Sequence, residues 1–242
     1  MKAMIFAAGL GTRLRPLTDT IPKAMVPVGG IPMLQRVIEH GIAHGIDEII
    51  INVHYLSKII VDFLQEKNHF GIQIHISDES EELLETGGGL VKAKLWLEGN
   101  KPFLVCNADV LTNINITDFF AKHRESRRLA TLAVRKRNSS RQLLFDATGR
   151  LCGRSNQKTN TLELKYPTDT ENISEYAFSG YHIIEPEIFK LIKRSGKFSI
   201  TDAYLDLCAE QDIQAYVHND DVWVDIGSLE KLKEAEIAAA GL

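Results

Sequence analysis

A short apolar run that ends at a glycine-rich loop opens the chain and limits the folds available to it. Residues 2–8 are almost continuously apolar, and Gly9 and Gly11 follow directly. A strand that is apolar on both faces is typical of a parallel sheet covered by helices on each side. Comparable short apolar runs recur at residues 48–53, 72–76 and 103–106.

Segments whose apolar residues have helical spacing separate these runs, at residues 33–44, 56–66 and 87–97. Strands that alternate with helices predict right-handed βαβ units. We therefore expect an α/β fold: a Rossmann-like three-layer α/β/α sandwich with a mixed, mainly parallel central sheet. Residues 9–32, between the first strand and the first helix, are expected to form a long functional loop.

The second half of the chain has a less regular pattern. Strand signals fall at residues 129–134, 143–145, 162–164, 176–184, 217 and 222–224. Helical signals fall at residues 188–193, 202–210 and 228–240. No repeat or low-complexity linker interrupts the sequence. We expect a single domain of residues 1–242, in which the regular half, 1–110, continues into the less regular half, 111–242.

Composition excludes several functional classes. The formal net charge is -4, whereas general nucleic-acid and membrane-surface binders usually carry a basic excess. No segment reaches the roughly 18 apolar residues of a membrane span. The three cysteines, Cys106, Cys152 and Cys208, are odd in number and far apart, which argues against a disulfide framework. We expect buried free thiols in a cytoplasmic protein that binds neither nucleic acid nor membrane.

The loop after the first strand carries the strongest chemical signal. It differs from a dinucleotide fingerprint because Leu14 stands where the third glycine belongs, and it lacks the Gly-Lys-Ser/Thr of a P-loop. Its glycines allow the backbone to approach a phosphate closely, and its arginines, Arg13 and Arg15, suit phosphate oxygens. Lys23 follows between Pro22 and Pro27, so a stiff loop presents its ammonium group near the same phosphates.

Together these segments resemble the signature of the sugar-1-phosphate nucleotidyltransferases. The first pattern is Gly-x-Gly-Thr-Arg-Leu-x-Pro-Leu-Thr and the second is Pro-Lys-x-Met-x-Pro. The resemblance continues in order through residues 85–89, 107–109, 178–180 and 223–227. It is greatest to the short members described as N-acetylmuramate-1-phosphate uridylyltransferases and to relatives described as mannose-1-phosphate guanylyltransferases. The resemblance implies transfer of a nucleotidyl group from a nucleoside triphosphate, with UTP or GTP favoured, to a sugar-1-phosphate.

The resemblance also implies roles for individual residues. Asp109 and Asp225 would hold Mg²⁺, which agrees with its preference for a few carboxylates completed by phosphate and water. Arg13 and Lys23 would be the catalytic cations. The nucleotide would be bound by Ala7, Ala8, Gly9, Gly11, Thr12, Glu85, Thr86, Gly87 and Gly88. Residues 1–110 then become the nucleotide-binding half and residues 111–242 the sugar-binding half.

The sugar site is expected around a strand that Ser179 and Gly180 interrupt, because glycine in a strand often marks the approach of a ligand. Arg141 and Asp202 are further candidates for sugar contacts, as is Asp146. The Tyr-Gly-Val and Glu-Lys-Pro elements of hexose-type members are absent, so the individual sugar contacts of those members do not transfer directly.

Several alternatives stay open. The chain could be a cytidylyltransferase for another sugar or alditol phosphate, or a catalytically silent regulatory subunit that senses nucleotide-sugars. Its partners would be a nucleoside triphosphate and a sugar-1-phosphate, in a monomer or homodimer. The sequence decides neither the base nor the sugar, nor whether the pathway is cell-wall recycling or polysaccharide precursor supply.

Overall fold

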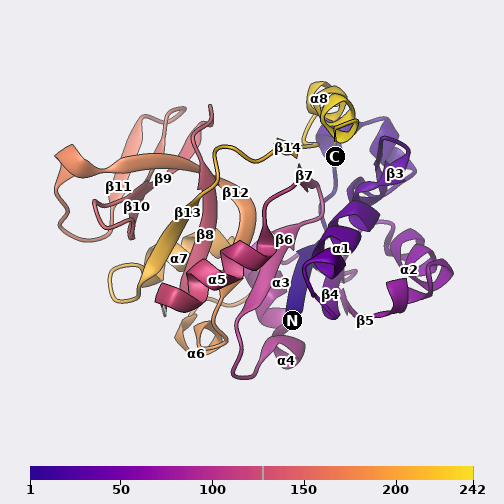
Figure 1. Cartoon of the computed structure of the whole chain (residues 1–242), viewed down its shortest axis with the longest axis horizontal. Helices are drawn as coiled ribbons and strands as arrows, with labels where there is room; N and C mark the ends of the chain where they lie inside the picture. Colours follow the sequence, from indigo (N-terminus) through magenta and orange to yellow (C-terminus); the bar gives the residue numbers. More distant parts are fainter. Residues whose placement is uncertain (127, 242) are drawn as a thin grey trace.

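The computed structural model describes residues 1–126 and 128–241, and a ten-stranded mixed sheet forms the centre of this part of the chain (Figure 1). Eight strands follow the order β11-β10-β9-β12-β6-β1-β4-β5, while β8 pairs with β12 and β13 pairs with β8. The parallel part of this sheet consists of β1 (Lys2–Phe6), β4 (Glu48–Val53), β5 (Gln73–Asp78) and β6 (Phe103–Asn107). The expected α/β architecture with a mixed, mainly parallel central sheet is therefore confirmed, and this parallel part comes from residues 1–110.

Helices cover both faces of the sheet because successive residues of each strand point to opposite sides. In β1, Ala3 and Ile5 belong to one core cluster and Met4 to the other. The first cluster includes side chains of α1 (Met33–Ala43), α2 (Ser57–Glu66) and α5 (Ile116–Ser126). The second includes side chains of α3 (Glu85–Lys92), α4 (Lys94–Leu97), α6 (Ile188–Leu191) and α7 (Ile200–Leu207).

The less regular half is built on one long antiparallel strand, β12 (Ser174–Ile184). Its second part pairs with β6 and with β8 (Ala130–Arg135), and its first residues pair with β9 (Arg141–Phe145). From β9 an arm continues through β10 (Leu151–Asn156) and β11 (Thr161–Leu164), at the upper left of Figure 1. Strand β13 (Ile213–Val217) completes the sheet beside β8.

The end of the chain returns to its beginning. Strand β14 (Trp223–Asp225) pairs with β7 (Val110–Thr112), and helix α8 (Leu229–Ala239) contacts the hairpin of β2 (Pro27–Val28) and β3 (Ile31–Pro32). Ser228 caps α8 by accepting a hydrogen bond from the Lys231 N–H, as its position predicts. A third core cluster fills this region: Leu14, Val26, Val28, Met33, Leu111, Ile226 and Ala235.

Some expectations about local structure were wrong. The segment 9–32 is not an unstructured loop, because it contains three short 3-10 helices, at Thr12–Leu14, Leu17–Asp19 and Lys23–Met25, and the hairpin. The helix expected over 87–97 begins two residues earlier and breaks after Lys92 into α3 and α4. Helix α5 and strands β7 and β10 were not expected. The cysteines are free and buried, as expected.

None of the helices in the described part of the chain is long and apolar enough to cross a membrane.

Candidate active site

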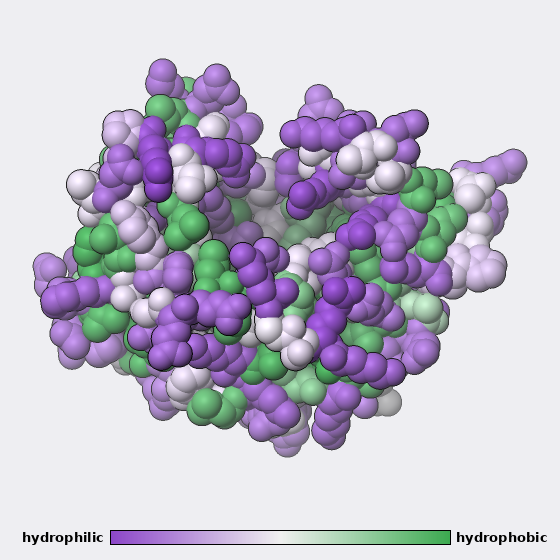
Figure 2. Space-filling model, turned by 180° about the vertical axis from the view of Figure 1, so that it is seen from behind, coloured by the Kyte–Doolittle hydropathy of each residue, from purple (hydrophilic) through white to green (hydrophobic). Residues whose placement is uncertain are grey.

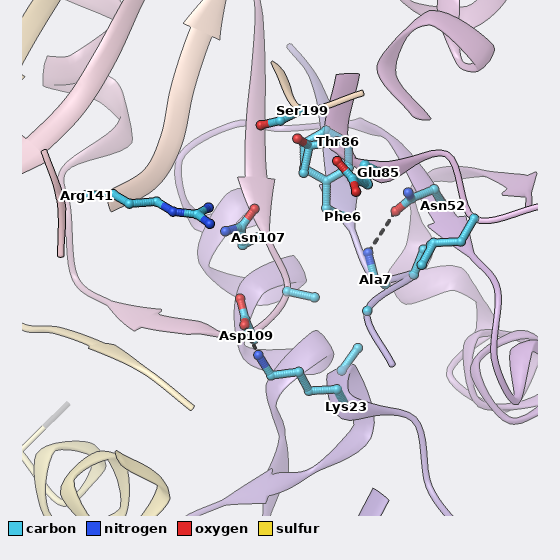
Figure 3. A pocket seen from close by; sticks show the side chains of 15 residues that line it. Phe6, Ala7, Lys23, Asn52, Glu85, Thr86, Asn107, Asp109, Arg141 and Ser199 are labelled. Atoms are coloured by element: carbon cyan, nitrogen blue, oxygen red, sulfur yellow. Dashed lines mark hydrogen bonds and ion pairs between the residues drawn. The ribbon is translucent and has the colours of Figure 1, made fainter. Parts of the chain in front are cut away.

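A cavity of about 470 Å³ opens where the carboxyl ends of β1 and β6 meet the loop of Lys23 and the start of α3 (Figure 3). Figure 2 shows that one face of the molecule is deeply hollowed between two lobes. The cavity is lined by Ala7, Ala8 and Gly9 from the first strand and its loop, by Asn107 and Asp109 beyond β6, and from the other half by Arg141 and Ser199. The cavity therefore lies at the edge of the sheet where open α/β folds bind ligands.

A buried polar network fixes the end of β1 beside the cavity. The Ala7 N–H donates to the Asn52 side-chain oxygen over 2.8 Å, and the Asn52 amide nitrogen donates to Glu79 over 2.7 Å. The second carboxylate oxygen of Glu79, which is fully buried, accepts from the Leu84 N–H just before α3. Because every member has a partner, this network holds the first loop and the start of α3 in a fixed relation. Neither Asn52 nor Glu79 was identified from the sequence.

The first loop folds tightly onto the loop of Lys23. Gly11 has a φ of 64°, and a Cβ atom there would lie 2.9 Å from the Thr18 methyl carbon and 3.1 Å from the Lys23 Cβ. The buried Thr18 hydroxyl donates to the Gly11 carbonyl. Glycine is thus required at position 11 by both conformation and space. Gly9 has no atom within 4 Å of such a Cβ, so its backbone faces open space at the cavity.

The structure brings together the three residues expected to carry the charge. The Lys23 ammonium forms an ion pair with the Asp109 carboxylate, and both side chains are largely buried. Asp225 lies opposite Val110 in the β7–β14 ladder, and the Ile226 N–H donates to the Asp109 carbonyl over 2.9 Å. The pairing of two three-residue strands therefore holds Asp225 beside Asp109.

The two carboxylates could hold a divalent cation whose remaining ligands come from water and substrate phosphate. Among the described residues, no group of three or more His, Cys, Asp or Glu side chains is placed to hold a metal ion. Mg²⁺ usually takes one or two carboxylates and completes its shell with water and substrate phosphate. Asp109 and Asp225 supply such a donor set, with Lys23 at hand as a neutralising cation.

Arg13 lies close to Asp225, on the side of the first loop. A Cβ atom on Gly227 would be 3.0 Å from one Arg13 nitrogen and 3.2 Å from an Asp225 oxygen, so both groups flank Gly227. Arg13 and its neighbour Thr12 are exposed. Arg15 instead pairs with Asp19 on the surface. Of the two arginines in this loop, Arg13 is thus the one that approaches Asp225.

The glycines after Glu85 pack closely against the segment before α7. Glu85 and Thr86 line the cavity, but the N–H groups of Gly87 and Gly88 donate to the Phe198 carbonyl. A Cβ on Gly87 would lie 2.3 Å from the Phe198 ring. Gly87 and Gly88 do not line the cavity, and their lack of a side chain allows α3 to approach the segment before α7.

Replacing Gly88 with alanine is expected to lower the free energy of unfolding by about 2 kcal/mol, because overpacking a filled interior costs that much. The new Cβ would lie 2.3 Å from the Gly196 carbonyl oxygen. Thermal unfolding by circular dichroism measures the change, with Gly9→Ala as the matched control because its Cβ meets no atom within 4 Å. Equal melting temperatures for Gly88→Ala and the wild type would contradict this account of the packing.

The strand expected at the sugar site is irregular where predicted. The pairing of β12 with β8 shifts register between Phe178 and His182, and Gly180 has a φ of 77°. A Cβ on Gly180 would lie 2.5 Å from the Asn107 amide nitrogen, so Gly180 lets β12 pass close to the cavity wall. The Ser179 hydroxyl, however, is buried against His218, 2.7 Å away, which disfavours the expected sugar contact by this side chain.

The other candidate sugar residues separate into two groups. Arg141 extends toward Asn107 and lines the cavity (Figure 3). Asp202 lies in an adjacent hollow and pairs with Arg154 over 2.8 Å. Asp146 holds a turn, because it accepts the N–H groups of Thr148 and Arg150, and it does not line the cavity. Arg141 is thus the best placed of the three.

The Cys106 thiol is not a nucleophile in this environment. Burial raises the pKa of the Cys106 thiol to about 12, so this group at the end of β6 stays protonated at neutral pH. The arrangement therefore offers cations, carboxylates and backbone groups, and it suits the binding and neutralisation of phosphates.

Comparisons with known proteins agree with this chemistry. The family model described as nucleotidyl transferase matches residues 2–240. The chain is 31% identical over 239 residues to a UTP–glucose-1-phosphate uridylyltransferase of Synechocystis sp., covering 95% of this chain but 61% of that relative. It is 32% identical over 246 residues to an N-acetylmuramate alpha-1-phosphate uridylyltransferase of Neisseria meningitidis serogroup B, covering 99% and 98% of the two chains.

Solved structures share the fold. A UDP-glucose pyrophosphorylase complexed with UDP-glucose superposes with a TM-score of 0.78 at 21% identity, over 99% of this chain and 98% of that one. The HddC protein from Yersinia pseudotuberculosis, complexed with GMP-PN, gives 0.76 at 23% identity, over 98% and 99%. Both likenesses bear on the architecture alone, and they extend over the whole described domain.

Proposed function

The chain belongs to the nucleotidyl transferase family, and from this premise we propose that it transfers a nucleotidyl group to a sugar-1-phosphate with release of pyrophosphate. UTP or GTP is the favoured donor, since relatives named for uridylyl and guanyl transfer match most of the chain. The observation that carries the proposal is the meeting of Lys23, Asp109 and Asp225 beside a glycine loop. Lys23 and Asp109 are 86 residues apart in sequence, yet they form an ion pair.

The proposed reaction is an in-line displacement. A phosphate oxygen of the sugar-1-phosphate forms a bond to the α-phosphorus, and the bond to the bridging oxygen of pyrophosphate breaks. The nucleophile is already anionic near neutral pH, so no general base is needed. Catalysis then consists of positioning the two phosphates and neutralising their charge.

The residues of the chain divide this work between them. Asp109 and Asp225 would hold Mg²⁺, which when bound supplies positive charge to the phosphate oxygens. Lys23 stabilises the charge that develops around the α-phosphorus, while Arg13 and the N–H groups of residues 9–12 bind the leaving phosphates. On the acceptor side, Arg141 and the Gly180 backbone bind the sugar.

The base and ribose would lie against the opposite wall of the cavity. Ala7 and Ala8 present a backbone that Asn52 holds in place, and Glu85 and Thr86 stand across from them. Backbone contacts of this kind hold a nucleotide without fixing which base is read. The nature of the base is therefore a matter for direct measurement.

Pyrophosphate release from a matrix of five triphosphates and a panel of sugar-1-phosphates tests the proposal. The panel contains N-acetylmuramate-, mannose-, glucose- and N-acetylglucosamine-1-phosphate, each with Mg²⁺ and with EDTA. We expect Mg²⁺-dependent release in at least one combination, with UTP or GTP as donor. Release with CTP alone would favour the cytidylyltransferase alternative. No release in any combination, together with calorimetric binding of a nucleotide-sugar, would favour the silent regulatory subunit.

A further inference from the structure

Arg137 is a half-buried cation that its surroundings hold in one orientation. Its guanidinium carbon lies 4.3 Å from the centre of the Trp223 ring, and one terminal nitrogen donates to the Phe178 carbonyl over 3.1 Å. The Trp223 ring is itself fixed, because its N–H donates to the Ser179 carbonyl over 2.9 Å. The Gln142 amide also donates to the Arg137 carbonyl. Both the side chain and its loop are therefore ordered before any ligand binds.

The charge of this guanidinium is not balanced by a close carboxylate. No Asp or Glu side chain forms an ion pair with Arg137 in the part of the chain that the structure describes. Its Nε–H is buried and has no hydrogen-bond partner there. Burial lowers the pKa of Arg137, and the more distant charge of Asp225 acts in the opposite direction. A cation with unused donors, partly removed from water, favours an anionic ligand.

The nearby Arg135 has its terminal nitrogens bonded within the protein and serves as a comparison for Arg137. It is the last residue of β8, two residues before Arg137, and its guanidinium carbon lies 5.9 Å from the centre of the same indole ring. Its two terminal nitrogens donate to the carbonyls of Asp221 and Asn219. Arg135 therefore ties β8 to the segment before β14, whereas Arg137 donates a single side-chain hydrogen bond to the described part of the chain.

The position of Arg137 indicates which anion it would meet. Trp223 begins the strand that ends at Asp225, so the guanidinium stands near one of the two carboxylates proposed to hold the metal. Arg13 approaches the same carboxylate from the first loop, where the triphosphate is proposed to bind. Arg137 instead lines a hollow of about 740 Å³ with residues of β9, β10 and β12. This hollow shares Arg141 and Ser199 with the cavity.

We propose that Arg137 binds the phosphate group of the sugar-1-phosphate and presents it to the α-phosphorus, an inference that builds on the proposed function. The planar guanidinium can offer two parallel N–H groups to two phosphate oxygens, which fixes the orientation of the nucleophile as well as its place. It also offsets part of the repulsion between this phosphate and the triphosphate. The chain thus divides its cations, with Arg13 and Lys23 on the donor side and Arg137 on the acceptor side.

Three variants test this inference in steady-state kinetics: Arg137→Gln, Arg137→Lys and the matched control Arg135→Gln. We expect Arg137→Gln to lower kcat/KM for the sugar-1-phosphate about 10- to 100-fold, since hydrogen bonds to a charged group contribute that much. The KM for the triphosphate should change less than about two-fold. Arg137→Lys should recover part of the lost kcat/KM, because lysine restores the positive charge but not the two parallel N–H groups of the guanidinium. Arg135→Gln should lower the melting temperature and leave both KM values near those of the wild type.

An unchanged kcat/KM for the sugar-1-phosphate in Arg137→Gln, or an equal rise in both KM values, would overturn the assignment. If the wild-type protein turned over no pair of substrates, the proposed function would be wrong. The anion site at Arg137 would then be tested by a binding measurement. Inorganic phosphate, titrated against Trp fluorescence, is the probe in that case. Weaker quenching in Arg137→Gln but not in Arg135→Gln supports an anion site at Arg137. Equal quenching in all proteins overturns it.

Discussion

Lys23→Ala is expected to lower kcat by about 100- to 1,000-fold, which is the usual effect of removing one group that stabilises transition-state charge. The ammonium group lies against Asp109 at the cavity and so stands where negative charge would develop on the transferred phosphate. The KM for the triphosphate should rise much less than kcat falls. Initial-rate measurements at saturating Mg²⁺ with the best substrate pair give both parameters.

Lys58→Ala is the matched control for this variant. Lys58 is an exposed lysine on α2 that pairs with Asp62 one helical turn away. Its removal should change neither kcat nor KM, and circular dichroism should show that both variants remain folded. Near wild-type turnover by Lys23→Ala would show that the ammonium group takes no part in the reaction.

Asp225→Asn is the second change with a large expected effect, again about 100-fold or more on kcat. Asparagine keeps the size of the side chain and the β7–β14 ladder, but it removes the negative charge that a hard cation requires. The Mg²⁺ concentration at half-maximal rate should therefore shift to higher values. Titration of the initial rate with Mg²⁺ measures this shift directly.

Asp220→Asn controls for the loss of a carboxylate in the same segment, since Asp220 is exposed and does not line the cavity. Its Mg²⁺ dependence should match that of the wild type. If Asp225→Asn kept the wild-type Mg²⁺ dependence, Asp225 would not be a metal ligand, and Asp109 would have to act with groups outside this ladder.

The strands of the first half were predictable because their signal is local. Residues 48–53 were expected as a strand and form β4 with the same bounds, since an unbroken apolar run between helices has few alternatives. Helix α5 was missed although Ile116, Phe119 and Phe120 are fully buried at helical spacing. Its many charged residues concealed that stripe. The helical spacing of these apolar residues is nevertheless present in the sequence.

The site was predictable to a smaller degree, for a physical reason. The motifs led to Lys23, Asp109 and Asp225, and residues 222–224 were expected as a strand, but its pairing with β7, which holds the two aspartates together, was not expected. Arg137 was missed entirely, because its significance depends on an indole ring 86 residues away. The close approach of Gly88 to the carbonyl of Gly196 was also not visible in the sequence. Contacts between distant segments decide such roles, and one sequence does not display them.

Because the last helix packs against the first loop, the site is completed late in the synthesis of the chain. Asp225 comes from β14, and α8 buries Ala235 against Leu14 and Val28, while Glu236 accepts the Gly29 N–H. A ribosome has therefore synthesised all of residues 1–110 long before the C-terminal residues that pack against the first loop emerge. A chain released before residue 225 would lack one of the two carboxylates. We infer that triphosphate turnover begins only when translation of this segment is finished.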